Sequence, residues 1–78
     1  MSTSVDDAVA VDVTIDDHEM HVRIRDGRTI SAPLEGFPRL ARASVEDLAE
    51  WRLIGAGEGI RWNRLDEDIS IAGLLRRG

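Results

Sequence analysis

The 78-residue chain is predicted to fold as one small α+β domain, in which an antiparallel β-meander precedes a short helix, a further strand and a C-terminal turn. Two patterns predict this class. Apolar residues alternate over three successive segments in the first half of the chain, and they recur at helical spacing in the middle. A chain this short cannot divide into two separately cored units. We therefore expect residues 1–7 to be a flexible lead-in and residues 8–78 to form a single domain.

Alternation of apolar and polar residues begins at Ala8 and predicts two consecutive strands. On the first strand, the residues expected to face the core are Val9, Val11, Val13 and Ile15. On the second strand, the corresponding residues are Met20, Val22 and Ile24, and the residues facing solvent are His21, Arg23 and Arg25. The residues between the strands favour a turn: Asp16, Asp17 and His18.

A third strand is predicted from Arg28 to Pro33, and parity decides the turn before it. A two-residue turn would place Ile30 opposite Arg23, among charged side chains. A three-residue turn instead pairs Ile30 with Val22. Because facing residues share a side of the sheet, we predict the three-residue turn, with Gly27 in a left-handed conformation.

The second half of the chain begins with a crossover between Pro33 and Pro38, which leads to a helix capped by Ser44. The apolar residues at helical spacing are Val45, Leu48, Ala49 and Trp51, and they predict about two turns. The residues expected to end this helix are Gly55, Gly57 and Gly59. A strand over 60–62, an acidic turn over 65–68 and a last short strand over 69–71 follow. Leu74 and Leu75 then pack a C-terminal turn onto the sheet.

The composition excludes several classes of function. Fifteen acidic residues against ten basic residues give a net charge of -5, which disfavours nucleic-acid binding and favours a basic partner. The chain has no cysteine, so disulfides, zinc–thiolate sites and thiol nucleophiles are excluded. We expect a cytoplasmic protein, because the chain shows neither a secretory signal pattern nor an apolar run approaching the ~20 residues of a membrane span.

No motif predicts catalysis, a cofactor or a metal. The glycines over 55–59 lack the lysine of a phosphate-binding loop, and they follow a predicted helix instead of opening one. His18 and His21 are three positions apart, so on a strand their side chains point to opposite faces. The acidic turn lacks the glycine and glutamate spacing of a calcium loop. A core this small also leaves little room for a catalytic cleft.

The two tryptophans have two open interpretations. In a small domain, Trp51 and Trp62 can supply core area, since one tryptophan buries ~150–250 Å². Tryptophan is also frequent among the residues that dominate protein interfaces.

A series of short motifs resembles a known family. The motifs are Asp26-Gly27-Arg28, Phe37-Pro38-Arg39-Leu40, Trp51-Arg52-Leu53-Ile54-Gly55, Gly57-Glu58-Gly59-Ile60-Arg61-Trp62, Leu65-Asp66-Glu67-Asp68-Ile69-Ser70 and Gly73-Leu74-Leu75. Together they resemble the prokaryotic domain-of-unknown-function family numbered 2442, from Val9 to Leu75. The resemblance implies a small α+β domain. In that family some members are fused to a helix-turn-helix domain, and others are encoded beside a second small family in an arrangement like a toxin–antitoxin pair.

These observations lead to a non-enzymatic protein-binding module, the antitoxin-like member of a two-gene system. Its expected partner is a small basic protein encoded nearby, because complementary charge raises association rate and specificity. The expected docking residues are Trp62, Arg64, Asp66, Glu67 and Asp68. The alternative is a nucleic-acid-linked regulator that uses Arg23, Arg25 and Arg28 on the first hairpin. A small enzyme or metal-binding domain is a third hypothesis. We expect a monomer or a homodimer and no membrane partner.

Overall fold

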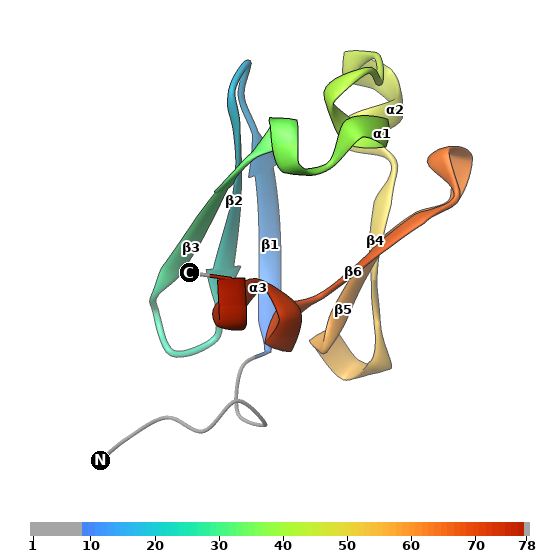
Figure 1. The fold of residues 1–78 in the computed structure, drawn as a ribbon. Coiled ribbons are helices and arrows are strands. Elements are labelled where there is room, and N and C mark those ends of the chain that lie inside the picture. The colour runs from blue at the N-terminus through green and yellow to red at the C-terminus, as the bar shows by residue number, and fades with distance from the viewer. Residues whose placement is uncertain (1–8, 78) are drawn as a thin grey trace.

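The chain forms two small antiparallel sheets and a few short helices (Figure 1), which confirms the predicted α+β class and meander. The computed structural model describes residues 9–77, so the lead-in expected at residues 1–7 lies outside the described residues. The first sheet contains β1 (Ala10–Ile15), β2 (Glu19–Ile24) and β3 (Thr29–Pro33), in that order. The second contains β4 (Trp51–Ile54), β5 (Gly59–Trp62) and β6 (Glu67–Ser70), again in chain order.

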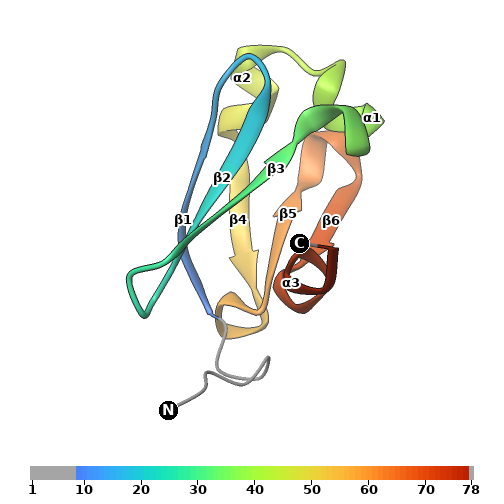
Figure 2. The same cartoon turned by 60° about the vertical axis from the view of Figure 1, so that its left-hand side comes forward.

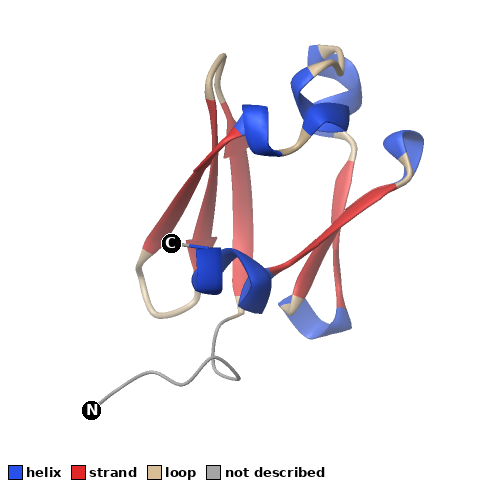
Figure 3. Cartoon of the chain, viewed as in Figure 1, coloured by secondary structure: helices blue, strands red, loops and turns tan. Residues whose placement is uncertain are grey.

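Short helical elements join and flank the sheets, as the colouring of Figure 3 shows. The connection between the sheets comprises the 3₁₀ turn η2 (Leu34–Gly36) and the helices α1 (Pro38–Ala41) and α2 (Val45–Ala49). Two further 3₁₀ turns, η3 (Gly55–Gly57) and η4 (Asn63–Leu65), lie within the second sheet's hairpins. Helix α3 (Ile71–Arg77) follows β6 and contacts both β6 and β3. None of the helices formed by the described residues is long and apolar enough to span a membrane.

The two sheets share one core. It contains residues from both sheets, from the connection between them and from α3: Ala10, Val13, Met20, Val22, Ile24, Leu34, Leu40, Ile60, Trp62, Ile69, Ile71 and Leu74. The inward residues of β2 are buried as predicted, because period-two alternation on a half-buried strand sends every second side chain inward. Every buried side chain among the described residues is apolar.

The turn between β2 and β3 has the predicted three-residue form. Val22 pairs with Ile30, and the N–H of Gly27 donates to the carbonyl oxygen of Ile24 at 2.9 Å. Gly27 has a φ of +100°, the left-handed conformation that parity required.

Strand β1 contains a bulge that the alternation did not reveal. The step from Ala10 to Asp12 matches a single step along β2, so β1 has one extra residue. Because of this extra residue, the alternation of inward and outward side chains before the bulge is out of step with the alternation after it. Ala10 is buried, whereas Val11 is 45% exposed. The prediction that Val11 shares a buried face with Val13 is therefore wrong, and Val9 is half-buried.

The predicted two-turn helix is shorter than expected. Ser44 caps α2 as predicted, since its Oγ accepts a hydrogen bond from the N–H of Asp47 at 3.1 Å. The helix ends at Ala49, however, and Trp51 begins β4. The sequence after Ala49 fits either period over such a short span, and pairing with β5 decides it in favour of a strand.

The glycines over 55–59 do not end a helix, which corrects the prediction. They join β4 to β5, where three consecutive residues with positive φ reverse the chain: Gly55 at +58°, Ala56 at +58° and Gly57 at +95°. The last predicted strand is also shifted. Ile71 begins α3 instead of ending a strand, and its N–H donates to the carbonyl oxygen of Glu58 at 2.9 Å.

Candidate protein-binding surface

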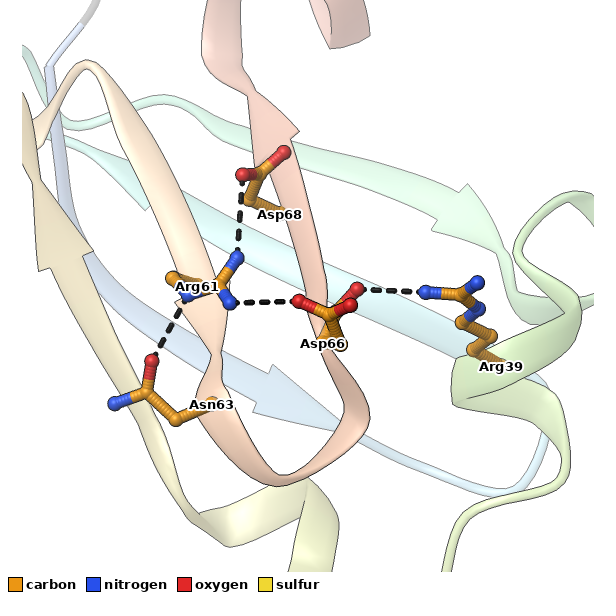
Figure 4. Close-up of polar contacts among 5 residues, drawn as sticks. All are labelled: Arg39, Arg61, Asn63, Asp66 and Asp68. Atoms are coloured by element: carbon orange, nitrogen blue, oxygen red, sulfur yellow. Dashed lines mark hydrogen bonds and ion pairs between the residues drawn. The ribbon is translucent and has the colours of Figure 1, made fainter.

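The acidic turn between β5 and β6 is organised around Arg61. Arg61 lies directly opposite Asp68 in the β5–β6 register, and its side chain reaches along the turn (Figure 4). Its Nη2 lies 2.8 Å from Oδ1 of Asp66, and its Nη1 lies 3.4 Å from Oδ2 of Asp68. Its Nε donates to Oδ1 of Asn63 at 2.9 Å. One guanidinium therefore holds two carboxylates and an amide in a defined arrangement.

The turn is also fastened to helix α1. Asp66 has a φ of +50°, a left-handed conformation that aspartate adopts more readily than most residues. Its carbonyl oxygen accepts a hydrogen bond from Nη1 of Arg39 at 2.7 Å (Figure 4). Because Arg39 belongs to α1, the backbone of the turn is fixed relative to the connection between the sheets.

The contacts favour the charged forms of Asp66 and Arg61. The hydrogen bond from Arg61, and secondly its charge, lowers the pKa of Asp66. In return, the hydrogen bond to Asp66 raises the pKa of Arg61. The side chains of Asp66 and Asp68 are 83% and 62% exposed, so solvent screens these pairs and each contributes little to folding stability. The carboxylates remain accessible to a partner.

The five expected docking residues differ in how exposed their side chains are. Asp66 is exposed at the turn, Glu67 is half-buried at the start of β6, and Asp68 is exposed on that strand. The predicted acidic turn over 65–68 therefore ends earlier, because pairing with β5 draws Glu67 and Asp68 into β6. Arg64 is exposed, and its Nε lies 3.3 Å from Oδ1 of Asp47 in α2. Trp62 is fully buried, so its side chain is not accessible to a partner in this structure.

Trp62 is buried and links two of the elements near this surface. Its Nε1 donates to the carbonyl oxygen of Leu48 at 3.0 Å and thereby links β5 to α2. Its cross-strand partner is Trp51, which is half-buried against the core. Of the two interpretations of the tryptophans, core packing therefore applies to Trp62, whereas Trp51 retains accessible surface.

Sequence reasoning missed the two arginines that fix the turn. Arg61 precedes an inward-facing tryptophan on a strand, so alternation alone places it outward. The sequence does not give the register that brings Arg61 opposite Asp68, and Arg39 is 27 positions away from its partner Asp66.

The arginines on the first hairpin are exposed, although they differ in their partners. Nε of Arg28 lies 2.7 Å from Oδ2 of Asp26, so this arginine is paired within the turn. The N–H of Arg28, followed by its side chain, lowers the pKa of Asp26. Arg23 and Arg25 are exposed and form no ion pair with other described residues.

His21 belongs to a polar cluster that does not include His18, the residue considered with it in the sequence. Its Nε2 lies 2.8 Å from Oδ2 of Asp16, and its Nδ1 lies 2.7 Å from Oγ of Ser31. Glu19 contributes a third possible ligand atom, within 4.8 Å of the others, whereas His18 is not in the group. The second carboxylate oxygen of Asp16 accepts from the backbone N–H groups of His18 and Glu19, so protein donors already occupy both oxygens.

The comparisons with known proteins agree on the fold. No curated protein matches the chain. The crystal structure of a protein of unknown function from Rhodospirillum rubrum ATCC 11170 is similar, with a TM-score of 0.77 and 28% sequence identity over 90% of this chain and 87% of that one. The model of the family described as "Protein of unknown function (DUF2442)" matches residues 10–78. Since this match includes both sheets and α3, the chain belongs to the DUF2442 family, as its motifs indicated.

Proposed function

We propose that this domain is a non-enzymatic protein-binding module, the antitoxin-like member of a prokaryotic two-gene system, and that its partner is a small basic protein. The observation that carries the proposal is the pair of exposed carboxylates held by Arg61 at the β5–β6 turn. A side chain that is already ordered loses less conformational entropy when a partner binds. The carboxylates of Asp66 and Asp68 are therefore suited to receive cationic side chains.

The charge of the whole chain supports the same kind of partner. A net charge of -5 attracts a basic protein over a distance and raises the rate of encounter. In addition, the described residues bury no polar or charged side chain. Enzymes commonly shift pKa values by such burial, so this distribution favours binding over catalysis.

The first experiment is purification of the tagged protein from its native host at moderate salt, with co-purifying proteins identified by mass spectrometry and nucleic acid measured by absorbance. The proposal predicts one stoichiometric small basic protein. The affinity for that protein is then measured for a variant with all three acids reversed: Asp66→Arg, Glu67→Arg and Asp68→Arg.

A matched control separates the surface from the net charge. It reverses three exposed acids elsewhere on the molecule: Asp12→Arg, Glu35→Arg and Glu58→Arg. Both triple variants change the net charge by the same amount. If both melt at similar temperatures, weaker binding by the first than by the second identifies a local surface. Equal affinities would show that the acidic turn is not the docking site.

The alternative function has its own signature in this experiment. Arg23 and Arg25 are exposed without ion pairs among the described residues, which is the observation in favour of a nucleic-acid-linked regulator. Such a regulator would co-purify with nucleic acid instead of a protein. Its affinity would fall steeply with salt, because phosphate contacts release counterions.

A further inference from the structure

The core between the two sheets reaches the surface on two sides, and neighbouring elements cover one of these sides more completely than the other. On the side of β3 and β6, α3 contacts both strands and lies beside the end of β6 (Figure 2). Its Ile71 and Leu74 are buried in the core, so α3 covers the core on this side. On the side of β1 and β4, η3 covers one end, since a Cβ placed on Gly57 would lie only 2.8 Å from the carbonyl oxygen of Ala10. The other end of this side is an open groove of about 550 Å³.

The walls of this groove are mainly apolar. Its lining includes Val13, Ile15, Leu40, Val45, Leu48 and Trp51. Val45 is 80% exposed although it lies at the start of α2, and Trp51 and Ile15 are half-buried. Accessible apolar side chains thus come from both walls, which is typical of a surface that another chain covers.

One wall is also an open sheet edge. Among the described residues, β1 pairs only with β2, so its other edge has no partner strand. The N–H of Asp16 donates to the carbonyl oxygen of Glu19 on the β2 side of the hairpin. Hydrogen-bonding positions alternate along an antiparallel pair, so the backbone groups of Val13 and Ile15 point away from β2, toward the groove. These groups can pair with an added strand.

The acidic residues at one end of the groove favour a basic occupant. Asp16 and Asp17 both line it. Asp16 is paired with His21, whereas Asp17 forms no hydrogen bond or ion pair with other described residues. A second copy of this chain would bring another molecule of net charge -5 against these carboxylates, which is unfavourable. A basic segment would be attracted.

We propose that this groove binds an extended basic segment of a partner protein, which adds as a strand to the open edge of β1. Apolar side chains of the segment cover Ile15, Trp51 and Val45, and an arginine or lysine pairs with Asp17. The inference rests on the proposed function, because it names a second contact with the same kind of basic partner. Trp62 and Arg64 connect the two surfaces, since both contact α2, which forms a wall of the groove.

The test uses a short blocked peptide of alternating valine and arginine as the probe. Binding is followed by two-dimensional amide NMR and by tryptophan fluorescence, in which the half-buried Trp51 is the reporter at the groove and Trp62 is fully buried. The peptide is expected to shift the amide resonances of Val13, Ile15 and Trp51. Asp17→Arg is expected to weaken binding about ten-fold, and Val45→Asp by a similar factor. Both residues are exposed, so both variants keep the fold.

The controls distinguish the groove from general charge attraction. Asp12→Arg changes the net charge equally on the same strand but outside the groove, and it is expected to leave the affinity within about two-fold. A peptide of equal charge in which proline replaces alternate valines cannot pair with a strand edge, and it is expected to lose binding.

Each contrary result identifies what fails. Equal binding by the proline peptide would overturn strand addition. Equal effects of Asp12→Arg and Asp17→Arg, or no binding at all, would overturn the groove as a site. Shifts confined to the acidic residues at 66–68 would also overturn the groove but would leave the proposed function intact. A concentration-dependent dimer that protects Val13 and Ile15 would show that the occupant is a second copy.

Discussion

At the scale of single residues, two glycines have the same backbone conformation but differ in how closely another segment approaches them. Gly27 and Gly57 have nearly equal φ values of +100° and +95°. An added Cβ at Gly27 meets no atom within 4 Å, whereas at Gly57 it would lie 2.8 Å from the backbone oxygen of Ala10. Gly27→Ala is expected to lower the free energy of unfolding by about 1–2 kcal/mol, the cost of the left-handed backbone alone.

Gly57→Ala has the additional cost of separating η3 from β1, and we expect a loss of about 2–5 kcal/mol. Urea denaturation of the two variants measures both values, and their difference isolates the close approach. If Gly57→Ala and Gly27→Ala destabilise equally, the contact between Gly57 and Ala10 is not a tight one.

Asp16 makes the stability of the first hairpin dependent on pH. The hydrogen bond from His21, followed by those from the N–H groups of His18 and Glu19, lowers the pKa of Asp16 far below its ordinary value of 3.8. A carboxyl whose pKa is lowered by folding stabilises the native state above its unfolded pKa, and this contribution is lost as the pH falls toward the folded pKa. Asp16→Asn is therefore expected to lower the melting temperature at pH 7, and the gap to the parent protein should narrow below about pH 4.

Asp17→Asn is the matched control for this prediction, because Asp17 lies in the same turn without a hydrogen bond to other described residues. Its effect on the melting temperature is expected to be small at every pH. A gap for Asp16→Asn that stays constant down to pH 2 would show that the charge of Asp16 has no role in the hairpin.

At the scale of elements, the short helix α2 depends on its cap. Helix α2 has five residues and no buried side chain, so its hydrogen bond from Asp47 to Ser44 matters more than it would in a long helix. Ser44→Ala is expected to cost about 1 kcal/mol, whereas Ser44→Asp retains an acceptor and is expected to be neutral. Chemical denaturation compares the two. A similar loss for both variants would contradict capping as the cause.

The elements also show what sequence patterns can and cannot predict. The turn at Gly27 was predictable because a wrong loop length sends Ile30 to the charged face, which burial forbids. The bulge at Val11 was not predictable, since an extra residue in a strand leaves the alternation of residue types unchanged. Strand β4 was missed because a helical period and a strand period both fit the residues around Trp51, and only pairing with β5 distinguishes them.

The same limits apply to the candidate surface. The exposure of Asp66 follows from its place in a turn, and sequence sufficed to find it. Asp68 is exposed as predicted, although it lies on β6 and not in the turn. The role of Arg61 depends on the register of two strands. The burial of Trp62 depends on how the second sheet faces the first, and no local pattern contains that information.

At the scale of the whole molecule, the groove side should differ from the α3 side in amide exchange. The amides of Met20, Val22 and Ile60 belong to central strands and are buried, so we expect them to exchange slowest. If the edge of β1 is open, the amides of Val13 and Ile15 exchange at rates typical of loops. Hydrogen exchange followed by NMR checks this in the isolated domain. Strong protection of both amides without a partner would show that something already covers the edge.

The sequential order of the two sheets has a consequence for how the chain can be divided. Each three-stranded meander is continuous in sequence, and residues 34–50 connect the two. A cut between Arg42 and Ala43, both outside the strands, leaves each fragment with a complete meander and one uncovered apolar face. Neither fragment can bury that face alone, whereas together they can. The domain is thus suited to fragment complementation, with two separately expressed halves restoring one fold when they meet.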